Sequence, residues 1–160
     1  IGDIVDGPQL AHKASQEGKR AVEILSGETP GTAGAIPFVV FTDPEIAWCG
    51  ISESEAKSTG LEISVAKYPW GASGRAQTLG RTEGMTKLVI DPKTERILGV
   101  GLVGAEVGEL IAEGVLALKM GATVHDLADS IHPHPTLSET LMEAAEAYLG
   151  RSTHIYKKKR

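Results

Sequence analysis

The run from Met85 to Val103, MTKLVIDPKTERILGVGLV, decides the fold class of this chain. Two apolar segments, residues 85–90 and 97–103, flank the polar connection Asp91–Arg96. Short apolar runs joined by a polar turn are typical of two antiparallel strands. Residues 99–104 superficially match the nucleotide-binding pattern G-x-G-x-x-G, but bulge-tolerant glycines inside an antiparallel strand explain this pattern better.

Other strand-like and helix-like segments precede this hairpin. The β-rich run at residues 37–42 and the partly alternating run at residues 61–69 are both predicted strands. Between them, Ser52-Glu53-Ser54-Glu55 is a capping-box pattern, which predicts a short helix that ends at Gly60. Residues 70–81 contain three glycines and are predicted to form a loop.

Helices are predicted after the hairpin. Apolar residues recur at helical spacing from Val107 to Leu118, and Gly121 closes that segment. A shorter helix is predicted at residues 124–128, and Leu137 to Tyr148 carry the apolar and small positions of a terminal helix. A strand, a helix, three strands and then helices predict the α+β class: an antiparallel sheet with helices packed on it.

The first 35 residues are predicted to form a separate piece. Residues 1–4 resemble the end of a buried strand, and Gly7-Pro8 is a turn before a helix with apolar positions from Leu10 to Leu25. Residues 28–35 are rich in Gly, Thr and Ala and are typical of a linker. We therefore expect one domain at residues 36–160, preceded by the strand-helix piece and linker.

Composition excludes several classes of protein. The net charge of −5 disfavours a nucleic-acid partner, and the basic run Lys157–Arg160 is expected to be a solvated tail. No apolar run approaches the roughly 20 residues of a membrane span. The single cysteine, Cys49, excludes an internal disulfide and a cysteine-rich zinc site, and it suits a reducing compartment such as the cytoplasm.

The stretch Ser130–Glu139 carries the residues most suited to chemistry. His134 can exchange protons near neutral pH, and a carboxylate such as Glu139 beside it would favour the charged ring. The same residues also fit a capping box, in which Glu139 would bond only to the backbone of Thr136. A metal site of His125, His132, His134 and Glu139 is disfavoured, because the prolines break helical ligand spacing and no cysteine joins them.

The motif His132-Pro133-His134-Pro135-Thr136-Leu137-Ser138-Glu139 resembles the H-x-H-P-T-L-x-E signature of dihydrolipoamide dehydrogenase, within the pyridine nucleotide-disulfide oxidoreductase family. The glutathione reductase branch shares H-P-T-x-x-E, so the additional histidine favours the lipoamide branch. Pro133 stands where the family usually has Ala. Residues 41–47 (FTDPEIA) and 72–76 (ASGRA) resemble further segments of these enzymes, and Gly2-Asp3 with residues 7–14 (GPQLAHKA) resembles their second FAD-binding motif.

The resemblance implies an activity and a set of site residues. His134 would be the catalytic base and Glu139 its partner, acting in the active site of the other subunit of a homodimer. FAD would contact Asp3, Leu10, Ala11 and His12, while the NAD site and the redox-active cysteine pair would lie outside this chain. The bond between His134 and Pro135 would be cis.

The resemblance also implies an origin and partners. The chain would be the C-terminal third of a longer enzyme: the tail of the FAD domain at residues 1–35, followed by the interface domain at residues 36–160. Its partners would be dihydrolipoamide carried by a lipoyl domain and the acyltransferase core of a 2-oxo acid dehydrogenase complex. Alternatives are a noncatalytic dimerisation or docking module, or the same domain of glutathione or mercuric reductase.

Overall fold

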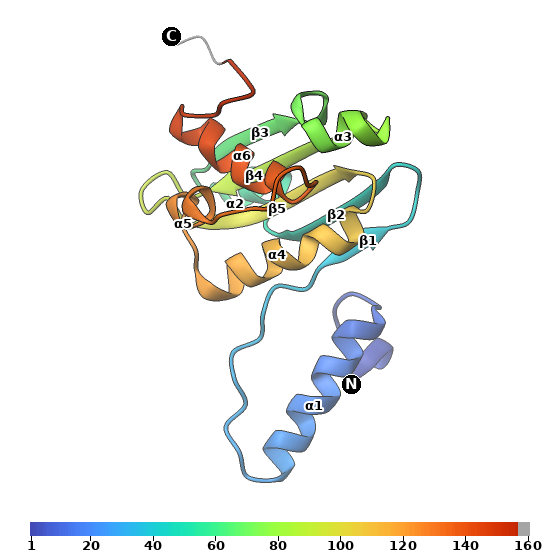
Figure 1. The fold of residues 1–160 in the computed structure, drawn as a ribbon. Coiled ribbons are helices and arrows are strands. Elements are labelled where there is room, and N and C mark those ends of the chain that lie inside the picture. The colour runs from blue at the N-terminus through green and yellow to red at the C-terminus, as the bar shows by residue number, and fades with distance from the viewer. Residues whose placement is uncertain (157–160) are drawn as a thin grey trace. The chain divides into compact units, whose positions relative to one another are not determined.

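The computed structural model describes residues 1–156, so the basic run Lys157–Arg160 lies outside the described residues. The chain divides into two compact units, Ile1–Ile36 and a second unit that begins at Pro37 (Figure 1). In residues 1–156, no helix is both long enough and apolar enough to cross a membrane.

The first unit consists of a 3-10 helix, η1 (Gly2–Ile4), and the helix α1 (Ala11–Leu25). The predicted helix is confirmed to within one residue. The strand expected at residues 1–4 is wrong: Ile4 is 90% exposed, and this unit has no strand with which an extended segment could pair. Residues 28–36 have no regular secondary structure, as expected of a linker.

The second unit is built on a five-stranded sheet in the order β1-β2-β5-β4-β3, in which every neighbouring pair is antiparallel. Its strands are β1 (Phe38–Val40), β2 (Glu45–Gly50), β3 (Ser64–Pro69), β4 (Met85–Ile90) and β5 (Ile97–Gly104). The predicted hairpin is confirmed as β4 and β5.

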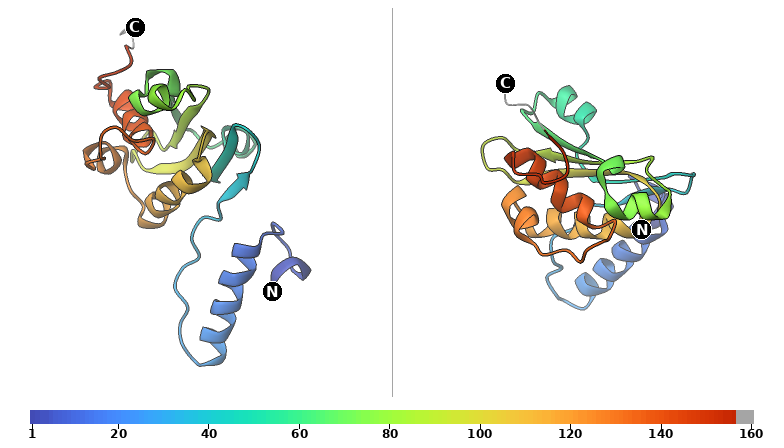
Figure 2. Two further views of the ribbon diagram at one scale, coloured as in Figure 1. Left: turned by 45° about the vertical axis from the view of Figure 1, so that its right-hand side comes forward. Right: turned by 45° about the horizontal axis from the view of Figure 1, so that its top comes forward.

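Helices cover one face of this sheet. Helix α4 (Val107–Met120) packs on β1, β2 and β5, and α6 (Glu139–Leu149) packs on β3 and β4, with α5 (Val124–Asp129) against α6. Helix α2 (Glu53–Thr59) lies on the other side of the sheet (Figure 2). The predicted α+β class, an antiparallel sheet with helices packed on it, is confirmed.

Strand β2 was not predicted, because its small residues face the covered side of the sheet and its large apolar residues face the open side. Ala47 and Cys49 point to the covered face and are small, whereas Ile46 and Trp48 are large and remain 39% and 36% exposed. The expected alternation of polar and apolar residues is therefore absent. Pairing with β5 supplies the backbone hydrogen bonds that make this segment a strand.

One glycine of β5, Gly99, permits a close backbone contact. A Cβ atom at Gly99 would lie 2.1 Å from the carbonyl oxygen of Ile51, at the connection between β2 and α2. No side chain fits into that space. Gly99 therefore allows this connection to cross directly over β5.

The thiol of Cys49 gives a pH-dependent prediction. Burial raises its pKa to about 11, against a smaller opposite effect of a hydrogen bond with the Val100 backbone. Because the pKa is higher in the folded state, this contribution to stability is complete below the ordinary thiol pKa of about 8.5 and is lost as the pH rises toward 11. We expect the free energy of unfolding to fall by roughly 3 kcal/mol more in the wild type than in Cys49→Ala between these pH values, measured by urea unfolding. Parallel pH profiles of the two proteins would contradict the buried thiol.

Candidate active site

An imidazole from the segment between α5 and α6 lies in contact with a carboxylate at the start of α6. The Nδ1 atom of His134 lies 2.9 Å from Oε1 of Glu139, the first residue of α6. The His134 side chain is 68% exposed, whereas that of Glu139 is 17% exposed. The peptide bond between His134 and Pro135 is cis, as expected.

Glu139 serves two partners at once. Its Oε1 atom faces His134, while its Oε2 atom accepts a hydrogen bond from the backbone N–H of Thr136 at 2.7 Å. Only half of the predicted capping box forms, because the Thr136 hydroxyl donates to the carbonyl of Pro133 instead of accepting from the first turn of α6. The backbone contact and the imidazole contact, which the sequence presented as alternatives, therefore coexist on the two oxygens of one carboxylate.

This geometry suits a general base. A carboxylate only accepts, so Nδ1 of His134 carries the proton, and Nε2 of the neutral ring holds the lone pair. Among the described residues, Nε2 has no hydrogen-bond partner. The exposed ring can therefore take a proton from an approaching molecule while Glu139 stabilises the resulting charge.

A small hollow lies beside this pair. Its volume is about 10 Å³, close to the smallest space that can hold one water molecule. It is lined by Tyr68, Ser73, Gly74, His134, Glu139, Thr140, Glu143 and His154. Burial, reinforced by the negative charges of Glu143 and Glu139, raises the pKa of Tyr68, so its phenol stays protonated beside the two carboxylates.

Three titratable residues of this hollow, Tyr68, Glu143 and His154, were not predicted from the sequence. Tyr68 comes from β3, Glu143 lies one turn beyond Glu139 on α6, and His154 follows that helix. Glu143 is 4% exposed and accepts hydrogen bonds from the hydroxyl of Ser152 and from Nδ1 of His154. The spacing of Glu139 and Glu143, four residues on one helix, was the only sequence signal for this arrangement.

A chain of buried hydrogen bonds connects the sheet to the start of α6. The indole N–H of Trp70 donates to the hydroxyl of Thr86 at 3.0 Å, and Thr86 donates to the hydroxyl of Thr140 at 2.8 Å. Thr140 in turn donates to the carbonyl of Leu137 at 2.8 Å. Because Thr140 directly follows Glu139, this series of hydrogen bonds fixes the part of α6 that carries the carboxylate.

The residues predicted to contact FAD lie in the first unit. Asp3 is exposed in η1, Leu10 is the N-cap residue of α1, and Ala11 and His12 begin that helix. Gly2 anchors η1 to α1, because its N–H donates to Glu17 at 2.7 Å and its carbonyl accepts from Lys13 at 3.2 Å. Leu10, at the N-cap position, makes no side-chain cap hydrogen bond.

The four residues of the metal alternative do not converge. His125 pairs with Glu95, His132 with Glu113, and His134 with Glu139. Within residues 1–156, no group of three or more His, Cys, Asp or Glu side chains could hold a metal ion.

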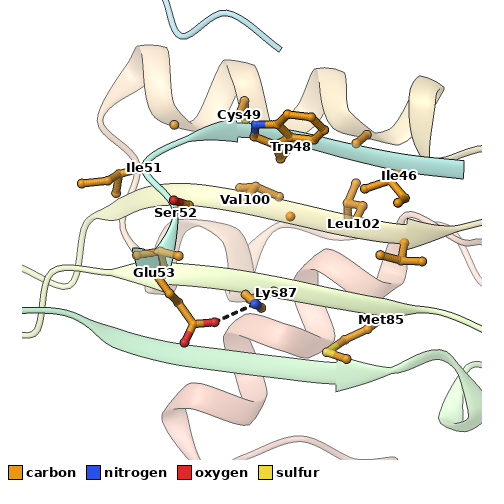
Figure 3. Close-up of a pocket in the computed structure, with 15 residues that line it drawn as sticks. Ile46, Trp48, Cys49, Ile51, Ser52, Glu53, Met85, Lys87, Val100 and Leu102 are labelled. Atoms are coloured by element: carbon orange, nitrogen blue, oxygen red, sulfur yellow. Dashed lines mark ion pairs between the residues drawn. The ribbon is translucent and has the colours of Figure 1, made fainter. Parts of the chain in front are cut away.

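A larger hollow, of about 310 Å³, lies on the sheet face opposite α4 and α6 (Figure 3). Ile46, Trp48 and Met85 line it, and an ion pair between Lys87 and Glu53 lies at its edge. The small hollow beside His134 and Glu139 is lined by Tyr68 and Thr140, which lie on the helix-covered side of the sheet. The larger hollow, on the opposite face, is therefore separate from this pair. The larger hollow is thus not part of the candidate active site.

The fold and the family match together define a dimerisation domain of the disulphide reductase class. The chain belongs to the family "Pyridine nucleotide-disulphide oxidoreductase, dimerisation domain", which matches residues 36–145.

Individual relatives agree with this assignment. The chain is 53% identical over 155 residues to the dihydrolipoyl dehydrogenase of Thermus scotoductus, covering 97% of this chain and 34% of that protein. It is 46% identical over 159 residues to the dihydrolipoyl dehydrogenase of Bacillus subtilis, covering 98% and 34%. The chain therefore spans about a third of the length of these curated relatives. The resemblance to dihydrolipoamide dehydrogenase inferred from the sequence is confirmed.

Solved structures show the same fold. LpdA from Mycobacterium tuberculosis superimposes with a TM-score of 0.85 at 28% identity, covering 92% of this chain and 32% of that one. The HOCl-induced flavoprotein disulfide reductase RclA from Escherichia coli gives a TM-score of 0.83 at 28% identity, covering 91% and 34%.

Proposed function

We propose that this chain is the interface part of a flavoprotein that oxidises dihydrolipoamide with NAD, and that His134 and Glu139 are its acid–base pair. The observation that carries this proposal is the 2.9 Å contact between Nδ1 of His134 and Glu139, with the rest of the ring exposed. The identity of 53% to a dihydrolipoyl dehydrogenase supports the choice of substrate.

The pair would generate the reactive form of the substrate. A thiol of dihydrolipoamide is mostly protonated at neutral pH, and only a thiolate attacks a disulfide efficiently. His134 would remove this proton through Nε2, while Glu139 would accept the hydrogen bond from Nδ1 and stabilise the charged ring. The thiolate would then attack the disulfide of a cysteine pair outside this chain, forming a mixed disulfide and releasing the other cysteine as a thiolate. Cys49 cannot supply this disulfide, because it is buried and alone.

The first unit suits a flavin, although the site would be only partly present in this chain. The anchored η1 presents Asp3 to solvent, and the start of α1 at Leu10, Ala11 and His12 offers the positive end of the helix dipole to a polar ligand. Asp3, Leu10, Ala11 and His12 would contact FAD, which would supply the redox chemistry between the cysteine pair and NAD. The NAD site would lie outside this chain.

The protein would act as a homodimer, in which His134 and Glu139 of one subunit complete the site of the other. The family's description as a dimerisation domain supports this arrangement. The substrate would arrive on a lipoyl domain, and the enzyme would dock to the acyltransferase core of a 2-oxo acid dehydrogenase complex.

A chimera tests the proposal. This chain would replace the matching third of the Thermus scotoductus enzyme, with which it shares 53% identity. We expect a dimer that reduces NAD with dihydrolipoamide, and no turnover by the 160-residue chain alone. A folded, FAD-loaded, dimeric chimera without this activity would favour a noncatalytic dimerisation module. Activity with glutathione but not with lipoamide would favour the glutathione reductase branch.

A further inference from the structure

The first histidine of the H-x-H motif, His132, has no part in the proton transfer described above, yet its ring is buried and both of its nitrogens make contacts. The His132 side chain is only 7% exposed. Its Nδ1 atom lies 2.9 Å from the carbonyl oxygen of Ser130, and its Nε2 atom lies 2.8 Å from Oε1 of Glu113. Both ring nitrogens therefore face oxygen atoms.

These contacts favour a ring that donates a hydrogen bond from each nitrogen. A carbonyl oxygen and a carboxylate oxygen can only accept hydrogen bonds, whereas a neutral imidazole has one N–H and one lone pair. A neutral His132 would place its lone pair against one of these oxygens. Only the doubly protonated ring donates to both, and the carboxylate of Glu113 compensates its charge.

The same contacts connect two parts of the second unit. Glu113 lies in the middle of α4, which packs on β1, β2 and β5, whereas His132 lies in an irregular segment two residues before His134. Pro133 joins the two histidines and limits the backbone freedom between them. A shift of the His132 ring would therefore displace His134 relative to Glu139.

We propose that His132 and Glu113 form a positioning pair, in which a buried imidazolium fastens the active-site segment to α4 and holds His134 in contact with Glu139. The positioning role rests on the proposed function of His134. Both ring nitrogens of His132 are occupied by contacts with oxygen atoms, so neither faces an approaching substrate. The first histidine of the motif, His132, thus has a role distinct from that of the second, His134.

The chain offers a matched control for this pair. His125 and Glu95 are also in contact, with Nε2 and Oε2 separated by 3.0 Å. Their side chains are 53% and 39% exposed, and His125 lies on α5, away from the segment between the two histidines of the motif. Glu95→Gln removes the same charge from the same kind of pair without touching the positioning pair.

The first experiment is nitrogen NMR of the histidine rings in the 160-residue chain at pH 7.5. We expect His132 to show two protonated nitrogens, and Glu113→Gln to convert it to a neutral ring. In that variant, the Nδ1–H resonance of His134 should weaken through faster exchange, whereas Glu95→Gln should leave it unchanged. A neutral His132 ring in the wild type, or an unaltered His134 resonance in Glu113→Gln, would overturn the proposal.

The second experiment measures turnover in the chimera described above. We expect Glu113→Gln to lower kcat about 5- to 20-fold with little change in KM. This loss is smaller than the roughly 100- to 10,000-fold typical of a lost proton-transfer group, because His134 itself remains. Glu113→Asp, which keeps the charge, should recover part of this loss, and Glu95→Gln should have normal turnover. Normal kcat in Glu113→Gln would overturn the positioning role. If His134→Gln also left turnover unchanged, the proposed function would fail too, whereas a charged His132 in the NMR experiment would still support the pair itself.

Discussion

Replacing His134 with Gln is expected to lower kcat for dihydrolipoamide oxidation about 100- to 10,000-fold in the chimera, the range typical of a lost general base. Gln cannot take the thiol proton, so the thiolate would have to form in solution before it attacks the disulfide. The side chain is 68% exposed, so its replacement removes little packing, and the stability of the protein should remain the same. Steady-state kinetics across pH 6 to 9, with urea unfolding of the same variant, separate the two effects.

Glu139→Gln is also expected to lower kcat, because it changes which nitrogen of His134 carries the proton. A Gln side chain has one acceptor oxygen, which the N–H of Thr136 would occupy, leaving the amide NH₂ to face His134. The ring would then present a lone pair at Nδ1 and carry its proton at Nε2, which is the wrong tautomer for accepting the proton of a thiol. We expect a loss in kcat of about 100-fold, smaller than for His134→Gln.

Glu55→Gln is the matched control for the carboxylate. Glu55 accepts a hydrogen bond from the backbone N–H of Ser52 at 2.8 Å, in a complete capping box at the start of α2, and has no histidine beside it. Its replacement should leave turnover near the wild-type value. Near-native turnover in both His134→Gln and Glu139→Gln would show that the pair has no part in catalysis.

The largest effect on stability is expected for Trp70→Ala. Trp70 is fully buried, and its ring is so closely enclosed that a Cβ atom at Gly104 would lie 2.3 Å from it, and one at Gly84 would lie 2.8 Å from it. Replacing a buried Trp with Ala leaves a cavity and costs roughly 3–5 kcal/mol. The variant also loses the hydrogen bond to Thr86. This cost is a large fraction of the roughly 5–15 kcal/mol that typically separates folded from unfolded protein.

Trp48→Ala provides the comparison, because these are the two tryptophans of the chain. Trp48 lies on the open face of the sheet, is 36% exposed, and stacks on Phe38 with ring centroids 4.9 Å apart. We expect a loss of about 1 kcal/mol, measured from urea midpoints at unchanged m-value. Equal losses for the two variants would contradict the central position of Trp70 in the core.

Local patterns in the sequence predicted some elements and missed others. The hairpin of β4 and β5 and the helices α1, α4 and α5 were predicted, because their apolar periodicity and turn residues act over a few neighbouring positions. The loop predicted at residues 70–81 instead contains η2 (Trp70–Ala72) and α3 (Gly74–Leu79). Its glycines suggested irregular structure, but Ser73 caps α3 through the N–H of Ala76, and Gly80 ends that helix in a left-handed conformation.

The sequence by itself determined the α+β class, the family and the candidate pair of His134 and Glu139, because these depend on short periodic patterns and on one dense motif. Only the tertiary structure decided that Glu139 serves a backbone N–H and an imidazole together, since the two oxygens of one carboxylate can face different partners. It also brought Glu113 to His132 across 19 residues. Such contacts depend on how α4 packs on the sheet, and no local spacing in the chain encodes that packing.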